Sequence, residues 1–91
     1  MSNASPKSQD VTKSKMTDKF SLILWNDDVN SFDDVIDALV EICEHDFIQA
    51  EQCATITHYK GKCEVKSGEP FTKLHSMKVQ FDMRKITTTI E

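Results

Sequence analysis

A run of carboxylate and amide side chains at residues 26–30 is the part of the sequence best suited to binding a cation. It reads Asn-Asp-Asp-Val-Asn, and the apolar residues Val29 and Phe32 flank its polar members. An ammonium group requires oxygen acceptors on several sides, and apolar neighbours reduce the screening of its charge. The run therefore predicts an ammonium-binding site, although the same residue types also form ordinary turns and helix caps.

A second candidate group surrounds His58, in the segment Thr-His-Tyr-Lys-Gly-Lys-Cys at 57–63. A histidine at a helix end usually caps the helix or faces solvent. It gains a binding role if the fold brings it to residues 26–28. There a neutral imidazole can accept a hydrogen bond from an ammonium group, whereas an imidazolium would repel it.

A calcium loop is an alternative for the first group. If the loop starts at Asp28, Asn30 suits the third position, but Phe32 stands at the fifth. Asp33 then replaces the required glycine, and Leu39 falls where the bidentate glutamate belongs. The pattern disfavours calcium.

Zinc and thiol chemistry are alternatives for the second group. Cys53, His58 and Cys63 are spaced five residues apart, which matches no paired C-x-x-C zinc pattern. A Cys53 or Cys63 nucleophile with His58 as its base is compatible with the spacing. Cys53 falls on the apolar face of a helix, however, where a thiol is usually inert. We expect no metal, no cofactor and no enzymatic activity.

The charge is unevenly distributed along the chain. Residues 1–19 sum to +2, residues 20–59 to −9 with no Lys or Arg, and residues 60–91 to +3, which gives the net charge of −4. The acidic block attracts cations and repels nucleic acid, or it forms only a solvated helix face. In either case we expect no nucleic-acid partner.

Length and composition favour a small binding module. A chain of 91 residues forms one domain with a modest core, which leaves little room for an elaborate active site. No apolar run reaches the roughly 18–20 residues of a membrane span, and no apolar signal segment follows the N-terminus. Three cysteines without a C-x-x-C pair fit reduced thiols. We expect a soluble cytoplasmic monomer without membrane contact.

The polar, Ser- and Lys-rich residues 1–18 predict a flexible tail, followed by a core domain at 19–91. In this domain, an apolar strand over 20–25 leads directly into the turn-forming residues that follow. Ser31 and Asp46 each precede a helical pattern and are expected to cap its start.

The second of these helices should end at about His58, before Gly61. Residues 62–66 alternate as a short strand, and residues 67–70 read as a turn. A third helix around Leu74 to Phe81 and a β-branched strand over 86–90 complete the chain. The order βααβαβ predicts an α/β fold, an α+β sandwich with a three-stranded antiparallel sheet packed on three helices.

Two motifs together resemble the ClpS family, the adaptors of the Clp protease. Residues 25–43 read WNDDVNSFDDVIDALVEIC, and residues 50–68 read AEQCATITHYKGKCEVKSG. The family pattern combines an N-D-D turn, a helix rich in V-I-x-x-L and an H-Y-x-G-K helix end. Both motifs and their separation match this pattern, closely over 20–68 and loosely over 69–91.

The resemblance implies N-degron recognition and no enzymatic activity. ClpS-like proteins bind substrates whose N-terminal residue is Leu, Phe, Tyr or Trp and pass them to a ClpA- or ClpC-like AAA+ unfoldase for degradation by ClpP. The residues that would hold the α-amino group are Asn26, Asp27, Asp28 and His58. The residues that would line the pocket for the first side chain are Asn30, Phe32, Val35, Ala54, Thr57 and Ile86.

The pocket residues depart from the commonest family pattern. Phe32 occupies a gate position where Met is frequent, and Asn30 replaces the usual Thr. Ala54 stands in place of a larger apolar residue, and Thr57 in place of an aliphatic one. We expect Ala54 to deepen the pocket and Phe32 to narrow its rim.

An alternative function is a small interaction domain that does not bind N-degrons. The C-terminal domain of the ribosomal stalk protein has a related fold, and a fold does not determine a function. Such a domain would lack the paired N-D-D and H-Y-K-G-K motifs.

Overall fold

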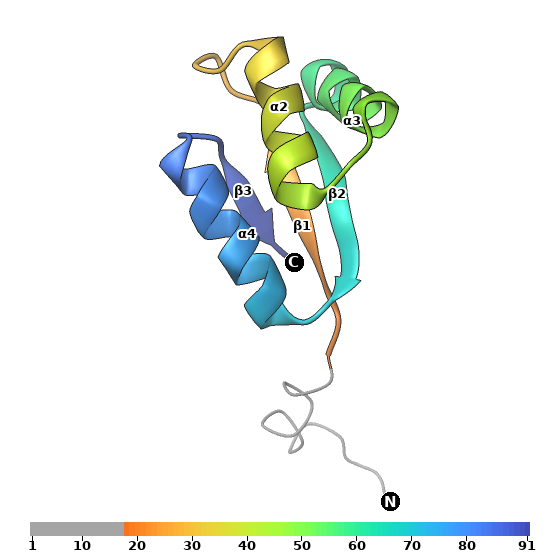
Figure 1. Ribbon diagram of the computed structural model, residues 1–91, viewed down its shortest axis with the longest axis vertical. Coiled ribbons are helices and arrows are strands. Elements are labelled where there is room, and N and C mark those ends of the chain that lie inside the picture. The colour runs from red at the N-terminus through yellow and green to blue at the C-terminus, as the bar shows by residue number, and fades with distance from the viewer. Residues whose placement is uncertain (1–17) are drawn as a thin grey trace, which may run out of the picture.

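The computed structural model describes residues 18–91, so the predicted tail over 1–18 lies, except for Asp18, outside the described residues. The elements in chain order are β1 (Phe20–Trp25), α2 (Phe32–Cys43), α3 (Phe47–Lys60), β2 (Lys62–Glu69), α4 (Phe71–Met83) and β3 (Thr88–Ile90) (Figure 1). This order confirms the predicted βααβαβ fold.

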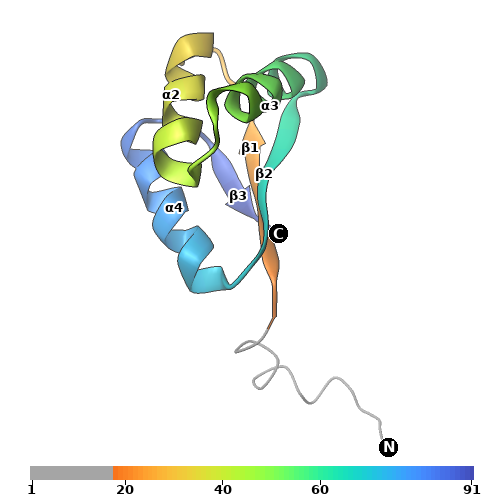
Figure 2. The same cartoon turned by 45° about the vertical axis from the view of Figure 1, so that its right-hand side comes forward.

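The sheet has the strand order β2-β1-β3, with both neighbours antiparallel to β1. The central strand β1 is the most apolar one, and Leu22 and Leu24 are buried beneath the helices. Figures 1 and 2 show α2 and α4 packed along the sheet, while α3 lies at the end where β1 stops and β2 begins. The core therefore occupies the layer between sheet and helices, with Leu39 and Phe81 at its centre.

The predicted caps define the helices that reach the candidate site. The Ser31 side chain accepts a hydrogen bond from the Asp34 N–H at 3.0 Å, and the Asp46 carboxylate accepts one from the Gln49 N–H at 2.8 Å. Each bond satisfies a donor that the first helical turn leaves free. Helix α3 continues to Lys60, two residues beyond its expected end.

The turn predicted over 67–70 is wrong, because β2 continues to Glu69. Phe20 pairs with Glu69 and Leu22 with Lys66, so β2 carries an extra residue in this stretch. Gly68 has a φ of +71°, a left-handed conformation that glycine adopts without a steric penalty. The glycine therefore serves an irregularity within the strand rather than its end.

The last strand begins at Thr88, two residues later than predicted. The Ile86 N–H donates to the Phe81 carbonyl at 3.0 Å, so residue 86 still completes the end of α4. Within residues 18–91, no helix combines the length and apolar character needed to cross a membrane.

Candidate functional site

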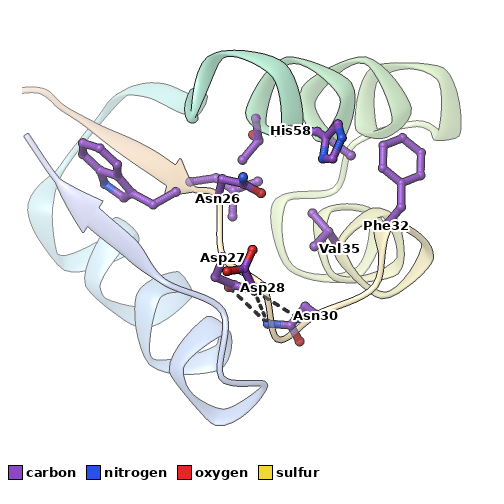
Figure 3. Close-up of a pocket in the computed structure, with 11 residues that line it drawn as sticks. Asn26, Asp27, Asp28, Asn30, Phe32, Val35 and His58 are labelled. Carbon is purple, nitrogen blue, oxygen red and sulfur yellow. Dashed lines mark hydrogen bonds between the residues drawn. The ribbon is translucent and has the colours of Figure 1, made fainter.

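The structure brings the two candidate groups together at one end of the sheet. The Asn26 N–H, directly after β1, donates to the carbonyl of Gly61 at 2.9 Å. Gly61 ends α3 with a φ of +93°, and its own N–H donates to the Thr57 carbonyl. This left-handed cap suits glycine and turns the chain from α3 into β2. His58 therefore faces the residues that follow β1 (Figure 3).

A pocket of about 360 Å³ lies between residues 26–30, the start of α2 and the end of α3. Its volume falls in the range of pockets for small ligands, about 300–1,000 Å³. The lining residues are Leu24, Trp25, Asn26, Asp27, Asp28, Asn30, Phe32, Val35, Ala54, Thr57 and His58. All the sequence-predicted site residues except Ile86 thus line one cavity.

Ile86 lies outside this pocket. Its side chain is 2% exposed and belongs to the core cluster. Its remaining surface lines a separate groove beside α2 and Arg84. The physical reason is the delayed start of β3, which leaves residue 86 folded back against the end of α4.

The carboxylate of Asp27 is occupied within its own turn. Its Oδ1 accepts hydrogen bonds from the Val29 N–H at 2.9 Å and the Asn30 N–H at 3.0 Å. Partial burial acts to raise the pKa of Asp27, but hydrogen bonds from Asn30 and Val29 outweigh it and hold that pKa below the ordinary value. Asp27 therefore remains ionised at neutral pH and shapes the turn.

Asp28 and His58 are free for a ligand. Both side chains are exposed, and among residues 18–91 neither accepts or donates a hydrogen bond through its side chain. The His58 ring packs edge-on against Tyr59 with the centroids 4.9 Å apart. An incoming cation can therefore bind without first breaking a bond within the protein.

The opposite wall of the pocket is apolar. Val35 and Ala54 contribute aliphatic groups, and Ala54 is buried. The Thr57 hydroxyl donates to the Cys53 carbonyl at 2.8 Å, so its polar group is satisfied within α3. Phe32 is 43% exposed and stands beside His58 at the rim (Figure 3). The cavity thus joins an acidic end to an apolar end.

Two lining residues, Leu24 and Trp25, were missed from the sequence. They are the last two residues of β1 and stand directly before residues 26–30. Their position next to this run in the sequence could have predicted that they line the same pocket. The Trp25 Nε1 donates to Thr89 Oγ1 at 2.8 Å, and the Lys62 Nζ lies 5.1 Å from the centre of the indole ring. Contacts to β3 and β2 therefore fix the orientation of the indole, while residue 25 itself lines the pocket at the end of β1.

The sequence matches the protein family described as "ATP-dependent Clp protease adaptor protein ClpS" over residues 15–87. The chain belongs to the ClpS family. ClpS proteins are adaptors of a protease rather than the protease itself. Among solved structures, Agrobacterium tumefaciens ClpS2 bound to L-phenylalaninamide matches with a TM-score of 0.76 and 17% identity, over 82% of this chain and 96% of that chain.

At this identity the likeness to ClpS2 shows a shared fold. No curated protein sequence matches the chain. Within the described part of this ClpS-family chain, no three His, Cys, Asp or Glu side chains are grouped so that they could hold a metal ion.

The three cysteines of this ClpS-family protein are buried, and we expect them to react slowly in the native state. Burial raises the pKa of Cys43 to about 11 and that of Cys63 to about 12, and it also raises the pKa of Cys53. Because the thiolate is the nucleophile, iodoacetamide at pH 8 should label the folded protein at least about tenfold more slowly than the urea-unfolded protein, as measured by mass spectrometry.

The same shifts give the sign of a pH effect on stability. The pKa values of these thiols are higher in the native protein than in the unfolded chain. The contribution of the buried, protonated thiols to the free energy of unfolding is therefore fully present below about pH 9 and is lost as the pH rises through the native pKa values. Equal labelling rates of the folded and the unfolded protein would contradict the expected protection of the buried cysteines.

Proposed function

We propose that this ClpS-family protein binds substrates through a free α-amino group and a bulky hydrophobic N-terminal side chain, namely that of Leu, Phe, Tyr or Trp. It would deliver them to a ClpA- or ClpC-like AAA+ unfoldase for degradation by ClpP, acting as a cytoplasmic monomer. The observation that carries this proposal is one continuous pocket with an acidic end at residues 26–28 and an apolar end at Val35, Ala54 and Thr57.

The acidic end suits an ammonium group. An α-amino group has an ordinary pKa near 7.7–8.0 and is mostly cationic at neutral pH. The ionised Asp27 and the exposed Asp28 favour this charge, while the Asn26 side-chain oxygen and a neutral His58 can accept its hydrogens. Acetylation of the substrate removes the charge together with two donors, which costs about 1–3 kcal/mol where the partners are desolvated.

The apolar end suits a large side chain. Burial of a Phe or Leu side chain contributes roughly 1.5–3 kcal/mol. Micromolar affinity corresponds to about 8 kcal/mol, so neither end of the pocket suffices alone. An internal Phe lacks the ammonium group and an N-terminal Gly lacks the side chain, and neither should bind.

The structural relative supports the same assignment. L-phenylalaninamide, the ligand of Agrobacterium ClpS2, has a free α-amino group and an aromatic side chain. These are the two groups for which the pocket of the present chain offers complementary ends.

The proposal is tested with three labelled peptides that differ only at the start, which is Phe, acetyl-Phe or Gly. We expect fluorescence anisotropy to detect micromolar or tighter binding of the free Phe peptide and at least about tenfold weaker binding of the other two. Equal binding of all three, or of none, would favour the alternative interaction domain that does not recognise N-degrons.

Delivery requires a separate arm of this experiment. A Phe-starting fluorescent reporter should be degraded faster by an unfoldase–ClpP pair when the adaptor is added. Free phenylalaninamide should suppress the gain, because it competes for the pocket. No acceleration with ClpA-type or ClpC-type unfoldases would reject delivery while leaving recognition intact.

A further inference from the structure

The turn at the acidic end of the pocket is tied to a distant part of the chain by Asn30. The Asn30 Nδ2 donates to the Lys85 carbonyl at 2.8 Å, although the two residues are 55 positions apart. The same nitrogen lies 3.3 Å from Asp27 Oδ2 and 3.4 Å from Asp27 Oδ1 (Figure 3 shows the bonds to Asp27). One side chain thus joins the carboxylate of the turn to the segment between α4 and β3.

The first three residues of that segment, 84–86, form the α4–β3 corner. Lys85 has a φ of +61°, a left-handed conformation that a residue with a β-carbon rarely adopts. The Lys85 N–H donates to the Asp82 carbonyl at 2.9 Å, so the corner is closed onto the end of α4. Arg84 forms an ion pair with Glu41 of α2, which holds the corner from a second side.

We propose that Asn30 is a positioning residue, which ties the turn to the α4–β3 corner and thereby fixes Asp28 where it meets the substrate's α-amino group. The corner then influences substrate affinity without touching the substrate. This inference rests on the proposed function.

The residue type at position 30 matters because an amide nitrogen carries two hydrogens. One can be directed to Asp27 while the other is directed to the Lys85 carbonyl. A hydroxyl side chain has a single hydrogen and could satisfy only one of these acceptors. Asn30 is therefore suited to a bridge between two acceptors.

The arrangement of the turn supports the same role. Asp27 already receives the backbone N–H groups of Val29 and Asn30, which curl the chain around its carboxylate. These local bonds set the shape of the turn. The bond to Lys85 holds the far end of the turn against the α4–β3 corner, as the bond from the Asn26 N–H to Gly61 holds its near end. A small displacement of a side chain that binds the ammonium group would remove much of its contribution to substrate affinity, because hydrogen bonds to charged groups depend on geometry.

The experiment changes the corner rather than the pocket. Lys85→Val places a β-branched residue where φ is positive and should displace the carbonyl that Asn30 contacts. We expect it to weaken binding of the Phe peptide by about tenfold and to bring this affinity closer to that of acetyl-Phe. Lys85→Gly accepts the same φ and keeps the carbonyl, so it should bind better than Lys85→Val.

Two further variants complete the test. Lys73→Val makes the same replacement at an exposed position near the start of α4 and should leave the affinity unchanged. Asn30→Ala removes the bridge itself and should weaken the Phe peptide about tenfold while acetyl-Phe changes little. In nitrogen-15 NMR spectra, Lys85→Val should shift the Val29 and Asn30 amide signals, since both amides donate to Asp27.

The ratio of free-Phe to acetyl-Phe affinity separates positioning from general stability. A merely structural role would lower the unfolding temperature and leave this ratio unchanged. An unaltered ratio in both Lys85→Val and Asn30→Ala would overturn the inference, as would equal affinities of Lys85→Val and Lys85→Gly. If Lys85→Val does not fold, Asn30→Ala decides. Failure of the unsubstituted protein to prefer the free Phe peptide would instead reject the proposed function, and this role with it.

Discussion

His58→Ala and Asp28→Ala should each weaken binding of a Phe-starting peptide by roughly ten- to a hundredfold while the domain remains folded. Each substitution removes one of the proposed acceptors for the substrate's ammonium group at the acidic end of the pocket. Because both side chains are exposed, their loss leaves no buried group unsatisfied. Fluorescence anisotropy measures the affinity, and thermal unfolding followed by circular dichroism checks the fold.

Tyr59→Ala is the matched control for this pair. Tyr59 neighbours His58 and contacts its ring, but it is 80% exposed and does not line the pocket. It should change the affinity by less than about threefold, as expected for an exposed position away from the site. Unchanged affinity in both His58→Ala and Asp28→Ala would remove these residues from the binding site.

Ala54→Met should reduce binding of Trp- and Phe-starting peptides by at least about tenfold, with a smaller loss for a Leu-starting peptide. Ala54 is 3% exposed and lies on the apolar wall, so a longer side chain there must extend into the cavity. The largest substrate side chains lose the most space. The measurement is the set of dissociation constants for peptides that begin with Trp, Phe and Leu.

Ile56→Met is the control for Ala54→Met. Ile56 lies on the same helix but is 41% exposed and outside the pocket, so this substitution should leave the order of the peptides unchanged. If Ala54→Met weakens all three peptides equally, the cavity beside Ala54 does not receive the substrate side chain. Tighter binding of Trp would contradict the prediction directly.

Local signals made most of the fold predictable from the sequence. Ser31 and Asp46 each stand before an amphipathic pattern, and Gly61 follows one, so the helix ends were encoded within a few residues. The same kind of signal failed at Gly68, since a glycine fits both a turn and an irregular strand. Which of the two forms depends on the pairing with β1, which is distant in sequence.

Which of Asp27 and Asp28 accepts the backbone hydrogen bonds of the turn was not predictable from their residue types. The two residues are chemically identical, and only the path of the backbone decides which carboxylate receives the Val29 and Asn30 N–H groups. The bond from Asn30 to Lys85 was hidden for the same reason, because it joins segments 55 residues apart. Ile86 was assigned to the last strand because its β-branched neighbours indicated a strand, whereas the chain at residue 86 still closes the end of α4.

The position of Trp25 has a practical consequence. It is the only tryptophan in the chain; residue 25 lines the pocket, while its indole donates to Thr89 and has the Lys62 ammonium over its ring. All tryptophan fluorescence therefore comes from this one site, and no second tryptophan masks a change of polarity around it. If the proposed binding changes the surroundings of Trp25, we expect it to be measurable by tryptophan fluorescence with unmodified Phe- or Leu-starting peptides, without a dye on either partner.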